Sequence, residues 1–238
     1  TEYGAAYLHG KTMRERALAL IHIAHPRFRP WLMAEAKSRK LVYSDQIELP
    51  FRLSLYPEEM ERWIALKEGT RAFLRPLKVT DEALVKDLFY QLSPESVHYR
   101  FFQLLRTMPH EKLQEFLRID YEANLALVVL TSSTDEDAQM VAIAHFLKDP
   151  RTNFAEAAFL VRDDWQDKGV GTLLMAALGE AARKQGIAGF TAEVLAANGR
   201  MLRVFHKSGF NVESHLEDGV YSLKIPFQEE RRGRATSP

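Results

Sequence analysis

The sequence predicts a mixed α/β fold in which helices flank a central sheet, with a helical appendage on the N-terminal side. Apolar segments of strand length alternate with amphipathic segments of helical spacing over most of the 238 residues. A strand over 154–162 runs into a glycine-punctuated turn and then a helix over 173–185, an arrangement that can hold a phosphate group. Residues 1–45 differ in character from the rest of the chain, since they contain two short helical patterns. Two such short helices cannot form a core alone.

The N-terminal appendage contains two predicted helices. A capping box that begins at Thr12 precedes an apolar helical run over 17–24. Pro26 opens a second amphipathic helix that continues to about residue 40. Residues 43–56 are bounded by proline and only weakly periodic, so we expect a linker that packs loosely.

The remaining segments predict one larger domain, in which proline and glycine mark the element boundaries. Pro94 behind Ser93 opens one helix and Pro109 opens the next, whereas Gly186 and Gly189 break the chain after the longest helix. The predicted elements are a hairpin over 63–77, helices over about 81–91, 94–105 and 110–119, strands over 125–130, 139–147 and 154–162, a helix over 173–185, a strand over 190–196, a helix over 199–207, and strands over 210–215 and 220–226.

Composition limits the class of protein. Lysine plus arginine equal aspartate plus glutamate at 32 each, so no net charge draws the chain to nucleic acid or to an anionic membrane. The absence of cysteine excludes disulfides, thiolate metal sites and a cysteine acyl-enzyme, and the eight histidines show no metal-ligand spacing. With no signal peptide and no apolar run of about 18 residues, the sequence suggests the cytoplasm.

The glycine turn has a pattern that suits a pyrophosphate. Gln166-x-x-Gly169-x-Gly171 leads into the helix, and Lys168 adds a cation. Unpaired backbone N–H groups at a helix start and the helix macrodipole both favour negative charge, and glycine lets the backbone approach closely. The spacing resembles the acyl-CoA loop of the GCN5-related N-acetyltransferase (GNAT) superfamily, which implies that acetyl-CoA is the cofactor.

Three further features resemble the same superfamily. Residues 198–210 resemble its last helix and closing Gly-Phe, residues 74–77 with 80–82 resemble its first strand and helix start, and residues 92–102 resemble bacterial protein lysine acetyltransferases of the Pat type. The resemblance implies a GNAT fold with a central, mostly antiparallel, splayed sheet. It also implies that acetyl-CoA lies along one strand, the glycine turn and the start of the last helix. The residues in question are Phe159, Val161, Gln166, Asp167, Lys168, Gly169, Val170, Gly171, Thr172 and Asn198.

The N-terminal residues resemble a different family. Residues 1–4, 8–11, 14–17 and 23–29 resemble the extreme C-terminal end of the acetyl-CoA hydrolase/transferase family. The catalytic glutamate of that family lies far upstream of this tail, so no CoA-transferase chemistry is expected from it. The resemblance, together with a first residue that is not methionine, implies a natural fusion with an upstream CoA-transferase domain of the same polypeptide.

We therefore expect four segments. They are a CoA-transferase-like helical tail over 1–45, a linker over 46–56, a GNAT acetyltransferase domain over 57–227, and a C-terminal tail over 228–238. The C-terminal tail is charged and lacks apolar periodicity, so it is predicted to be disordered.

Acetyl transfer from a thioester to an amine requires a base, because a lysine-like nucleophile has a pKa of about 10.4 and must lose a proton. Glu156 is the lone carboxylate in an apolar strand and shares a face with Ala158 and Leu160. It also falls at the position of the catalytic glutamate of Pat-type enzymes, which implies that it is the general base, directly or through one water. The alternative is a strand-end carboxylate that faces solvent or a basic neighbour. Glu193 on the next strand is the alternative base or a helper, unless it serves in a structural ion pair.

The resemblance implies less about the other catalytic groups. The main chains of Phe159 and Val161 would hold the pantetheine arm, and a nearby N–H would polarise the thioester carbonyl. Many relatives place a tyrosine four residues before the glycine of the final Gly-Phe to protonate the leaving thiolate, but the residue at that position is Phe205. Water or direct thiolate release is therefore expected. His98 is expected to line a helix interface or the acceptor cleft and not to serve as the base. Residues 99–102 are expected in the core and at its edge, with a recognition box as the alternative.

These features predict an N-acetyltransferase that moves an acetyl group from acetyl-CoA to an amine by direct attack in a ternary complex. The Pat-type resemblance of residues 92–102 implies that the amine is a protein lysine, and a small-molecule amine is the alternative. The fusion is also consistent with a different class of function, a non-catalytic acyl-CoA sensor that regulates the CoA-transferase domain. No nucleic acid, membrane or metal is expected as a partner.

Overall fold

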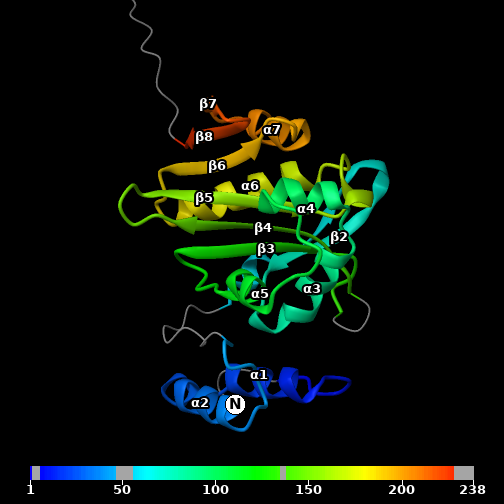
Figure 1. Cartoon of the computed structure of the whole chain (residues 1–238), viewed down its shortest axis with the longest axis vertical. Coiled ribbons are helices and arrows are strands. Elements are labelled where there is room, and N and C mark those ends of the chain that lie inside the picture. Colours follow the sequence, from blue (N-terminus) through cyan, green and yellow to red (C-terminus); the bar gives the residue numbers. More distant parts are fainter. Residues whose placement is uncertain (2–5, 47–55, 135–137, 228–238) are drawn as a thin grey trace, which may run out of the picture.

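The computed structural model describes residues 1, 6–46, 56–134 and 138–227, which form a sheet domain and an N-terminal helical pair (Figure 1). The mixed α/β class expected from the sequence is confirmed. Most of the predicted linker and all of the predicted disordered tail over 228–238 lie outside the described residues.

An eight-stranded sheet forms the centre of the molecule, with strand order β1-β2-β3-β4-β5-β6-β8-β7. Its strands are β1 (Arg62–Ala65), β2 (Arg71–Pro76), β3 (Asn124–Leu130), β4 (Met140–Lys148), β5 (Phe154–Val161), β6 (Gly189–Leu195), β7 (Glu213–Glu217) and β8 (Val220–Pro226). Every neighbouring pair is antiparallel except β5 and β6, which run parallel. The expectation of a mostly antiparallel sheet is therefore confirmed.

Helices cover both faces of this sheet (Figure 1). They are α1 (Met13–His22), α2 (Arg29–Ser38), α3 (Glu82–Tyr90), α4 (Pro94–Phe101), α5 (His110–Leu117), α6 (Val170–Lys184) and α7 (Gly199–His206), with short 3-10 turns at Pro26–Phe28, Glu58–Met60, Lys67–Gly69, Val79–Asp81 and Asp163–Trp165. On one face, Leu174 of α6 joins a core that contains Phe146. On the other, Leu88 of α3 and Leu117 of α5 join a second core with Ile143. No helix within the described ranges is long and apolar enough to cross a membrane.

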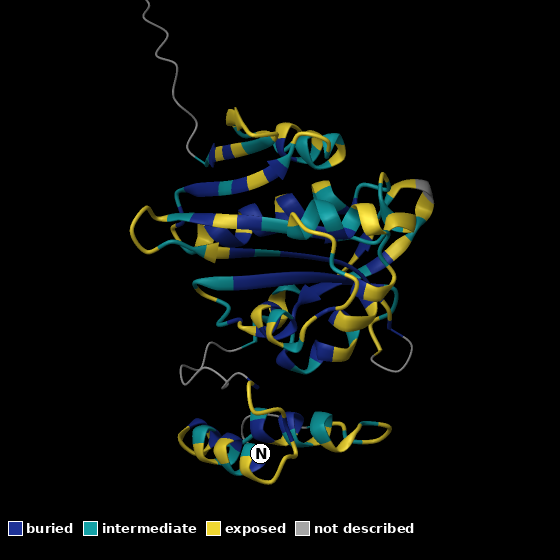
Figure 2. Ribbon diagram, in the orientation of Figure 1, coloured by how far each residue is buried: buried dark blue, intermediate teal, exposed yellow. Residues whose placement is uncertain are grey.

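Successive residues of the central strands contribute to the two cores in turn. On β4, Ala144 and Phe146 belong to the α6 core, whereas Ile143 belongs to the core beneath α3 and α5. Because both faces are covered, β3 and β4 are buried along nearly their whole length (Figure 2). This double burial explains why the sequence shows apolar runs rather than strict alternation in these strands.

The sheet opens where β5 and β6 diverge. The two strands pair at only three positions, the last of which joins Glu156 to Thr191, although both strands continue for several residues beyond that pair. Gly189 allows the close approach at the paired end, since a Cβ atom there would lie 2.5 Å from the backbone oxygen of Ile225. The splayed sheet expected from the sequence is therefore present, and Glu156 lies at the fork.

The predicted capping box sets the start of α1. Thr12 accepts a hydrogen bond from the N–H of Glu15, and the Glu15 carboxylate accepts one from the N–H of Thr12. The helix therefore begins at Met13, ahead of the predicted run over 17–24. The second predicted helix is a 3-10 turn over Pro26–Phe28 that continues into α2.

Other boundaries also differ from the sequence prediction. α4 ends at Phe101 instead of continuing to residue 105, because Phe102 adopts the left-handed conformation with a φ of 58°. α6 begins at Val170 instead of residue 173, which makes the second half of the glycine turn the first helical turn. β7 begins at Glu213 instead of residue 210.

α1 and α2 pack against the sheet domain. Leu18 and Ile21 of α1 and Met33 of α2 belong to the same core as α3 and α5. At the edge of this contact, Arg14 forms an ion pair of 2.7 Å with Glu82 of α3. The helical pair therefore completes a core that α3 and α5 leave open.

The start of the predicted linker is also fixed in place. Asp45 lies 2.7 Å from Nδ1 of His110 on α5. Gln46 is 1% exposed, and its side-chain amide donates a hydrogen bond to the side chain of Gln114. A buried amide needs such a partner. Gln46 is therefore packed, whereas residues 43–45 are exposed.

Candidate functional site

A cavity fills the gap where β5 and β6 diverge. Its walls come from β5, β6, α4, α7 and the loop that leads from β5 into α6. The predicted site residues that line it are Glu156, Glu193, Phe159, Val161, Gln166, Asp167, Gly169, Gly171, Thr172 and Asn198. The fold therefore brings most of the predicted catalytic and cofactor-binding residues to one place, and the exceptions are Lys168 and Val170.

Two carboxylates border the cavity at the fork of the sheet. Glu156 lies opposite Leu147 on β4 and Thr191 on β6, and its side chain is exposed. Glu193 is two residues beyond Thr191 on the same face of β6 and is also exposed. In the described part of the chain, neither carboxylate forms an ion pair with a lysine, arginine or histidine. Both are therefore available to accept a proton from a bound molecule.

The start of α6 presents backbone N–H groups at the cavity. Gly169 has a φ of 91°, a conformation that favours glycine, and α6 begins at the next residue. The N–H groups of Val170, Gly171 and Thr172 precede the intrahelical hydrogen bond from the N–H of Leu173 to the carbonyl of Gly169 at 3.0 Å. Together with the helix macrodipole, these N–H groups suit a pyrophosphate.

The side chains of two predicted cofactor-binding residues lie outside the cavity. The ammonium of Lys168 is 5.3 Å from the ring centre of Trp165, and it does not line the cavity. Val170 is 1% exposed and belongs to the α6 core. Val170 can therefore contribute only its main chain to a ligand, and Lys168 only a longer-range positive charge.

Several cations beyond the predicted site residues line the cavity. Arg200, Arg203 and Lys207 follow one another at helical spacing along and just after α7, which is a signal that could have found them. Lys67 comes from the turn between β1 and β2, and its ammonium donates to the main-chain oxygen of Asp167 at 3.2 Å. No local pattern connects those two residues, which are 100 positions apart in the sequence.

The side chain of Gln166 holds the glycine turn in place through hydrogen bonds. Its amide donates to the main-chain oxygen of Val161 at 3.1 Å and to the hydroxyl of Ser96 at 3.1 Å. Its side-chain oxygen accepts from Arg200 at 3.1 Å, and Arg200 also pairs with Asp167 at 3.1 Å. The Val161 carbonyl, which was expected to hold a pantetheine arm, is therefore engaged by Gln166.

α7 forms the wall opposite α4. Asn198 caps this helix, because its side-chain oxygen accepts the N–H of Met201 at 3.1 Å. Phe205 is 1% exposed, and its ring meets that of Phe159 edge-on with 5.6 Å between the ring centres. The residue that replaces the family tyrosine is thus part of an apolar contact.

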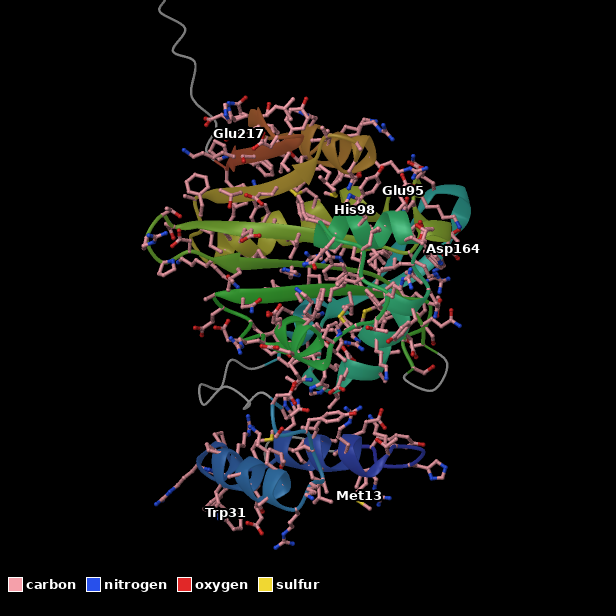
Figure 3. The ribbon with its side chains drawn as sticks, in the orientation of Figure 1. Met13, Trp31, Glu95, His98, Asp164 and Glu217 are labelled. Carbon is pink, nitrogen blue, oxygen red and sulfur yellow. The ribbon has the colours of Figure 1, made fainter. Side chains whose placement is uncertain are left out.

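α4 is tied to the loop that precedes α6. Asp163 accepts hydrogen bonds from the N–H and hydroxyl of Ser93 at 2.9 and 2.7 Å and from the hydroxyl of Ser96 at 2.8 Å. Burial raises the pKa of Asp163, but these hydrogen bonds outweigh it and leave the pKa below its usual value. Figure 3 shows Glu95 and His98 on the helix that this contact holds in place, and of these two Glu95 lines the cavity.

A cation lies close to the fork on the α4 side. The guanidinium of Arg100 is 5.3 and 5.4 Å from the ring centres of Phe101 and Phe116, and 3.5 Å from Nε2 of His145. Burial lowers the pKa of Arg100 to about 10, partly offset by the negative charge of Glu156, so the guanidinium stays charged at neutral pH. The predicted position of residue 100, in the core or at its edge, does not account for this charge beside Glu156.

Burial and the charge of Arg100 lower the pKa of His145 to about 3, which makes the stability of the protein depend on pH. An exposed histidine has a pKa of 6.5, so between these two values the unfolded chain binds the extra proton. The free energy of unfolding should therefore fall as the pH drops from 6.5 towards 3. The free energy of unfolding of His145→Gln, measured by urea titration, should fall less steeply than that of wild type between pH values of about 7 and 4. His215→Gln, at an exposed position, should show the same pH dependence of the free energy of unfolding as wild type. An equally steep pH dependence for His145→Gln and wild type would contradict the expectation.

Comparison with known proteins identifies the family. The sequence profile of the Acetyltransferase (GNAT) family matches residues 94–210. The crystal structure of the GNAT domain of Pat from S. lividans is similar with a TM-score of 0.65 and 30% sequence identity, over 72% of this chain and 99% of that one. The chain belongs to the GNAT acetyltransferase family. It is an acetyl-CoA-dependent N-acetyltransferase, and the predicted GNAT fold is confirmed.

Further GNAT relatives agree with this assignment. Acetyltransferase PA5475 of Pseudomonas aeruginosa is 28% identical over 163 residues, which cover 68% of this chain and 87% of that protein. Acetyltransferase Pat of Mycolicibacterium smegmatis is 29% identical over 147 residues, 61% of this chain and 43% of that protein. The chain thus spans less than half of the length of this second relative. The structure of yncA from Salmonella typhimurium with its cofactor acetyl-CoA shares the fold, with a TM-score of 0.52, 18% identity and coverage of 70% and 99% of the two chains.

The N-terminal segment has its own relatives. Residues 1–36 match the acetyl-CoA hydrolase/transferase C-terminal domain. A stretch of 39 residues is 67% identical to 4-hydroxybutyrate coenzyme A transferase of Clostridium kluyveri, and it covers 16% of this chain and 9% of that protein. The resemblance expected for the N-terminal segment is therefore confirmed.

The packing of α6 on α7 gives a test of the GNAT cofactor site. A Cβ atom at Gly171 would lie 3.1 Å from Cγ2 of Val204, so a branched side chain would force α7 away from α6. Gly171→Val should destabilise the protein by about 1–3 kcal/mol and weaken acetyl-CoA binding, as measured by urea unfolding and calorimetry. Ala176→Val, at an exposed position of the same helix, introduces the same side chain away from α7 and is the control. Equal acetyl-CoA affinity in the two variants would argue against the role of this packing in the cofactor site.

Proposed function

We propose that this enzyme transfers the acetyl group of acetyl-CoA to lysine side chains of proteins, by direct attack within a ternary complex. The observation that carries the proposal is the position of Glu156, an exposed carboxylate at the fork of β5 and β6. It borders a cavity whose wall also includes the start of α6, which suits a pyrophosphate. The similarity of the chain to proteins named Pat supports a protein acceptor.

The cavity has suitable groups for each part of acetyl-CoA. The N–H groups at the start of α6 would hold the pyrophosphate, while Lys67 and the cations of α7 add positive charge around it. Beyond Glu156, β5 has no partner strand on the β6 side, so its free main-chain groups can bind the pantetheine arm. Phe159 lies on this stretch, and Asn198 at the start of α7 also lines the cavity.

Glu156 would act as the general base. Its carboxylate takes the proton from the acceptor ammonium, directly or through one water, and the neutral amine then attacks the thioester carbonyl. A main-chain N–H of the unpaired stretch of β5 would stabilise the oxyanion that forms. Glu193, on the same side of the cavity, would help to attract the positively charged lysine.

We also propose that the acetyltransferase domain comprises residues 57–227 and that residues 1–45 are the tail of a CoA-transferase domain in the same polypeptide. The matches of residues 1–36 to the C-terminal domain of acetyl-CoA hydrolase/transferase support this fusion. Sequencing the coding region upstream of Thr1 tests it. An open reading frame for a CoA-transferase joined in frame is the expected result, and a stop codon immediately upstream would contradict it.

A direct assay tests the proposed activity. The protein is incubated with acetyl-CoA and candidate proteins, CoA release is measured, and acetylated lysines are identified by mass spectrometry. The same assay with free lysine, polyamines and amino acids measures transfer to small amines. We expect acceptor-dependent CoA release and lysine acetylation on folded proteins, whereas transfer confined to small amines would contradict the proposed acceptor.

A further inference from the structure

The N-terminal helical pair carries a second apolar surface besides the one that packs against the sheet domain. Four of its large apolar side chains are exposed, at 63, 49, 53 and 64%: Met13 and Leu20 on α1, Phe28 just before α2, and Trp31 on α2. Met13 and Leu20 are seven positions apart and therefore share one face of α1. Figure 3 shows Met13 and Trp31 on the side of the pair that points away from the sheet. We call these four residues the outer patch.

The opposite surface of the helical pair is already occupied. Leu18 and Ile21 of α1 and Met33 of α2 are buried in the core that they share with α3 and α5. Trp31 is two positions before Met33, which places the two side chains on opposite sides of α2. A helix that covers one domain needs one apolar face, whereas exposed apolar side chains that gather on a second face mark a surface for a partner. The outer patch therefore calls for a second partner.

The comparison with known proteins indicates which partner this is. Residues 1–36, which contain the whole outer patch, match the C-terminal domain of acetyl-CoA hydrolase/transferase. A stretch of 39 residues corresponds to only 9% of 4-hydroxybutyrate coenzyme A transferase of Clostridium kluyveri, so most of such a protein lies outside this stretch. Two helices of 10 residues each cannot form a core alone, so in a CoA-transferase they must pack against the rest of that protein. The outer patch is the apolar surface that the sheet domain leaves free for this contact.

We propose that the outer patch docks on the CoA-transferase domain of the same polypeptide, so that α1 and α2 are packed between the two domains. This docking rests on the fusion proposed above. On the other side, the helical pair is held to the sheet domain by the shared core and by the ion pair of 2.7 Å between Arg14 and Glu82. Docking of the outer patch therefore fixes the orientation of the acetyltransferase cavity relative to the CoA-transferase domain.

Hydroxyl-radical footprinting tests this docking, because the oxidation rates of methionine and tryptophan increase with their exposure. The polypeptide translated from the whole open reading frame is compared with the 238-residue chain. We expect Met13 and Trp31 to be oxidised about tenfold more slowly in the longer polypeptide, since side chains at the centre of an interface lose nearly all of their exposure. Trp63, 46% exposed on β1, should be oxidised equally in both and is the internal reference. Equal oxidation of Met13 and Trp31 in the two polypeptides would overturn the proposal.

A substitution within the outer patch tests whether this surface makes the contact. Trp31→Ser in the longer polypeptide should restore about half or more of the oxidation rate that Met13 shows in the shorter chain, because tryptophan side chains contribute strongly to interface stability. Its acetyl transfer and its unfolding transition as the 238-residue chain should match those of wild type, since Trp31 is exposed there. Leu104→Ser, at a 74% exposed position outside the helical pair, is the matched control and should leave Met13 protected. Full protection of Met13 in Trp31→Ser would contradict docking through the outer patch.

Other outcomes distinguish this docking from the fusion on which it rests. A 238-residue chain that sediments as a dimer, with Met13 and Trp31 protected, would assign the outer patch to a second copy of the chain and overturn the proposal. A stop codon immediately upstream of Thr1 would refute the fusion itself, and the docking with it. A fused polypeptide that acetylates lysines but leaves the outer patch open to oxidation would refute only the docking.

Discussion

Glu156→Gln is expected to lower kcat for acetyl transfer by about 10²- to 10⁴-fold, the range for loss of a general base. Glutamine has nearly the same size but cannot accept the proton of the acceptor ammonium. The side chain of Glu156 is exposed and forms no ion pair within the described residues, so folding and acetyl-CoA affinity should be preserved. Steady-state kinetics, calorimetry with CoA and thermal unfolding measure these three quantities separately.

The pH dependence and a neighbouring variant provide the controls. Raising the pH should partly restore the rate of Glu156→Gln, because a larger fraction of the acceptor lysine is then already deprotonated. Glu193→Gln should have a much smaller effect on kcat, since it would help to attract the acceptor without taking its proton. Full activity of Glu156→Gln would remove its role as base, and a larger loss in Glu193→Gln would move that role to Glu193.

Asp81→Ala is expected to destabilise the protein by about 3–5 kcal/mol, the usual cost of breaking a buried ion pair from one side. The carboxylate of Asp81 makes a bidentate contact of 2.6 and 2.9 Å with Arg75, and both side chains are buried. It also accepts the N–H of Lys78 at 2.7 Å, which fixes the chain between β2 and α3. Alanine would leave the guanidinium of Arg75 in the core without this carboxylate. Urea unfolding followed by circular dichroism measures the change.

An exposed ion pair gives the matched control for this stability prediction. Glu180 pairs with Lys184 one turn along α6, at 2.8 Å, and both side chains are more than half exposed. Glu180→Ala should cost only about 0.3–0.5 kcal/mol, because water screens the pair. Similar losses for the alanine variants of Asp81 and Glu180 would show that the buried contact contributes far less than its geometry suggests.

Much of the fold was predictable because local signals agree with the tertiary structure. The capping box at Thr12, the apolar strands and the glycine turn each fixed an element to within a few residues. The predicted element boundaries were wrong where one residue adopts a special backbone conformation, or where the sequence pattern does not show which residue caps a helix. Phe102, with its positive φ, ended α4 early, although nothing in its side chain favours that conformation.

The candidate site was predictable where its residues follow one another along the chain. The loop 166–172 and Glu156 could be found from spacing and from a lone charge in an apolar strand. Lys67 and Arg100 could not, since they reach the cavity from elements distant in sequence. The engagement of the Val161 carbonyl by Gln166 also depends on packing that no linear pattern encodes.

The shared core of α1, α2, α3 and α5 has a consequence for how the chain can be divided. The segment that matches one family, residues 1–36, does not pack as a separate unit, because Leu18 and Ile21 share a core with α3 and α5, and Arg14 pairs with Glu82 of α3. An acetyltransferase domain excised without α1 and α2 would need new apolar cover for this core.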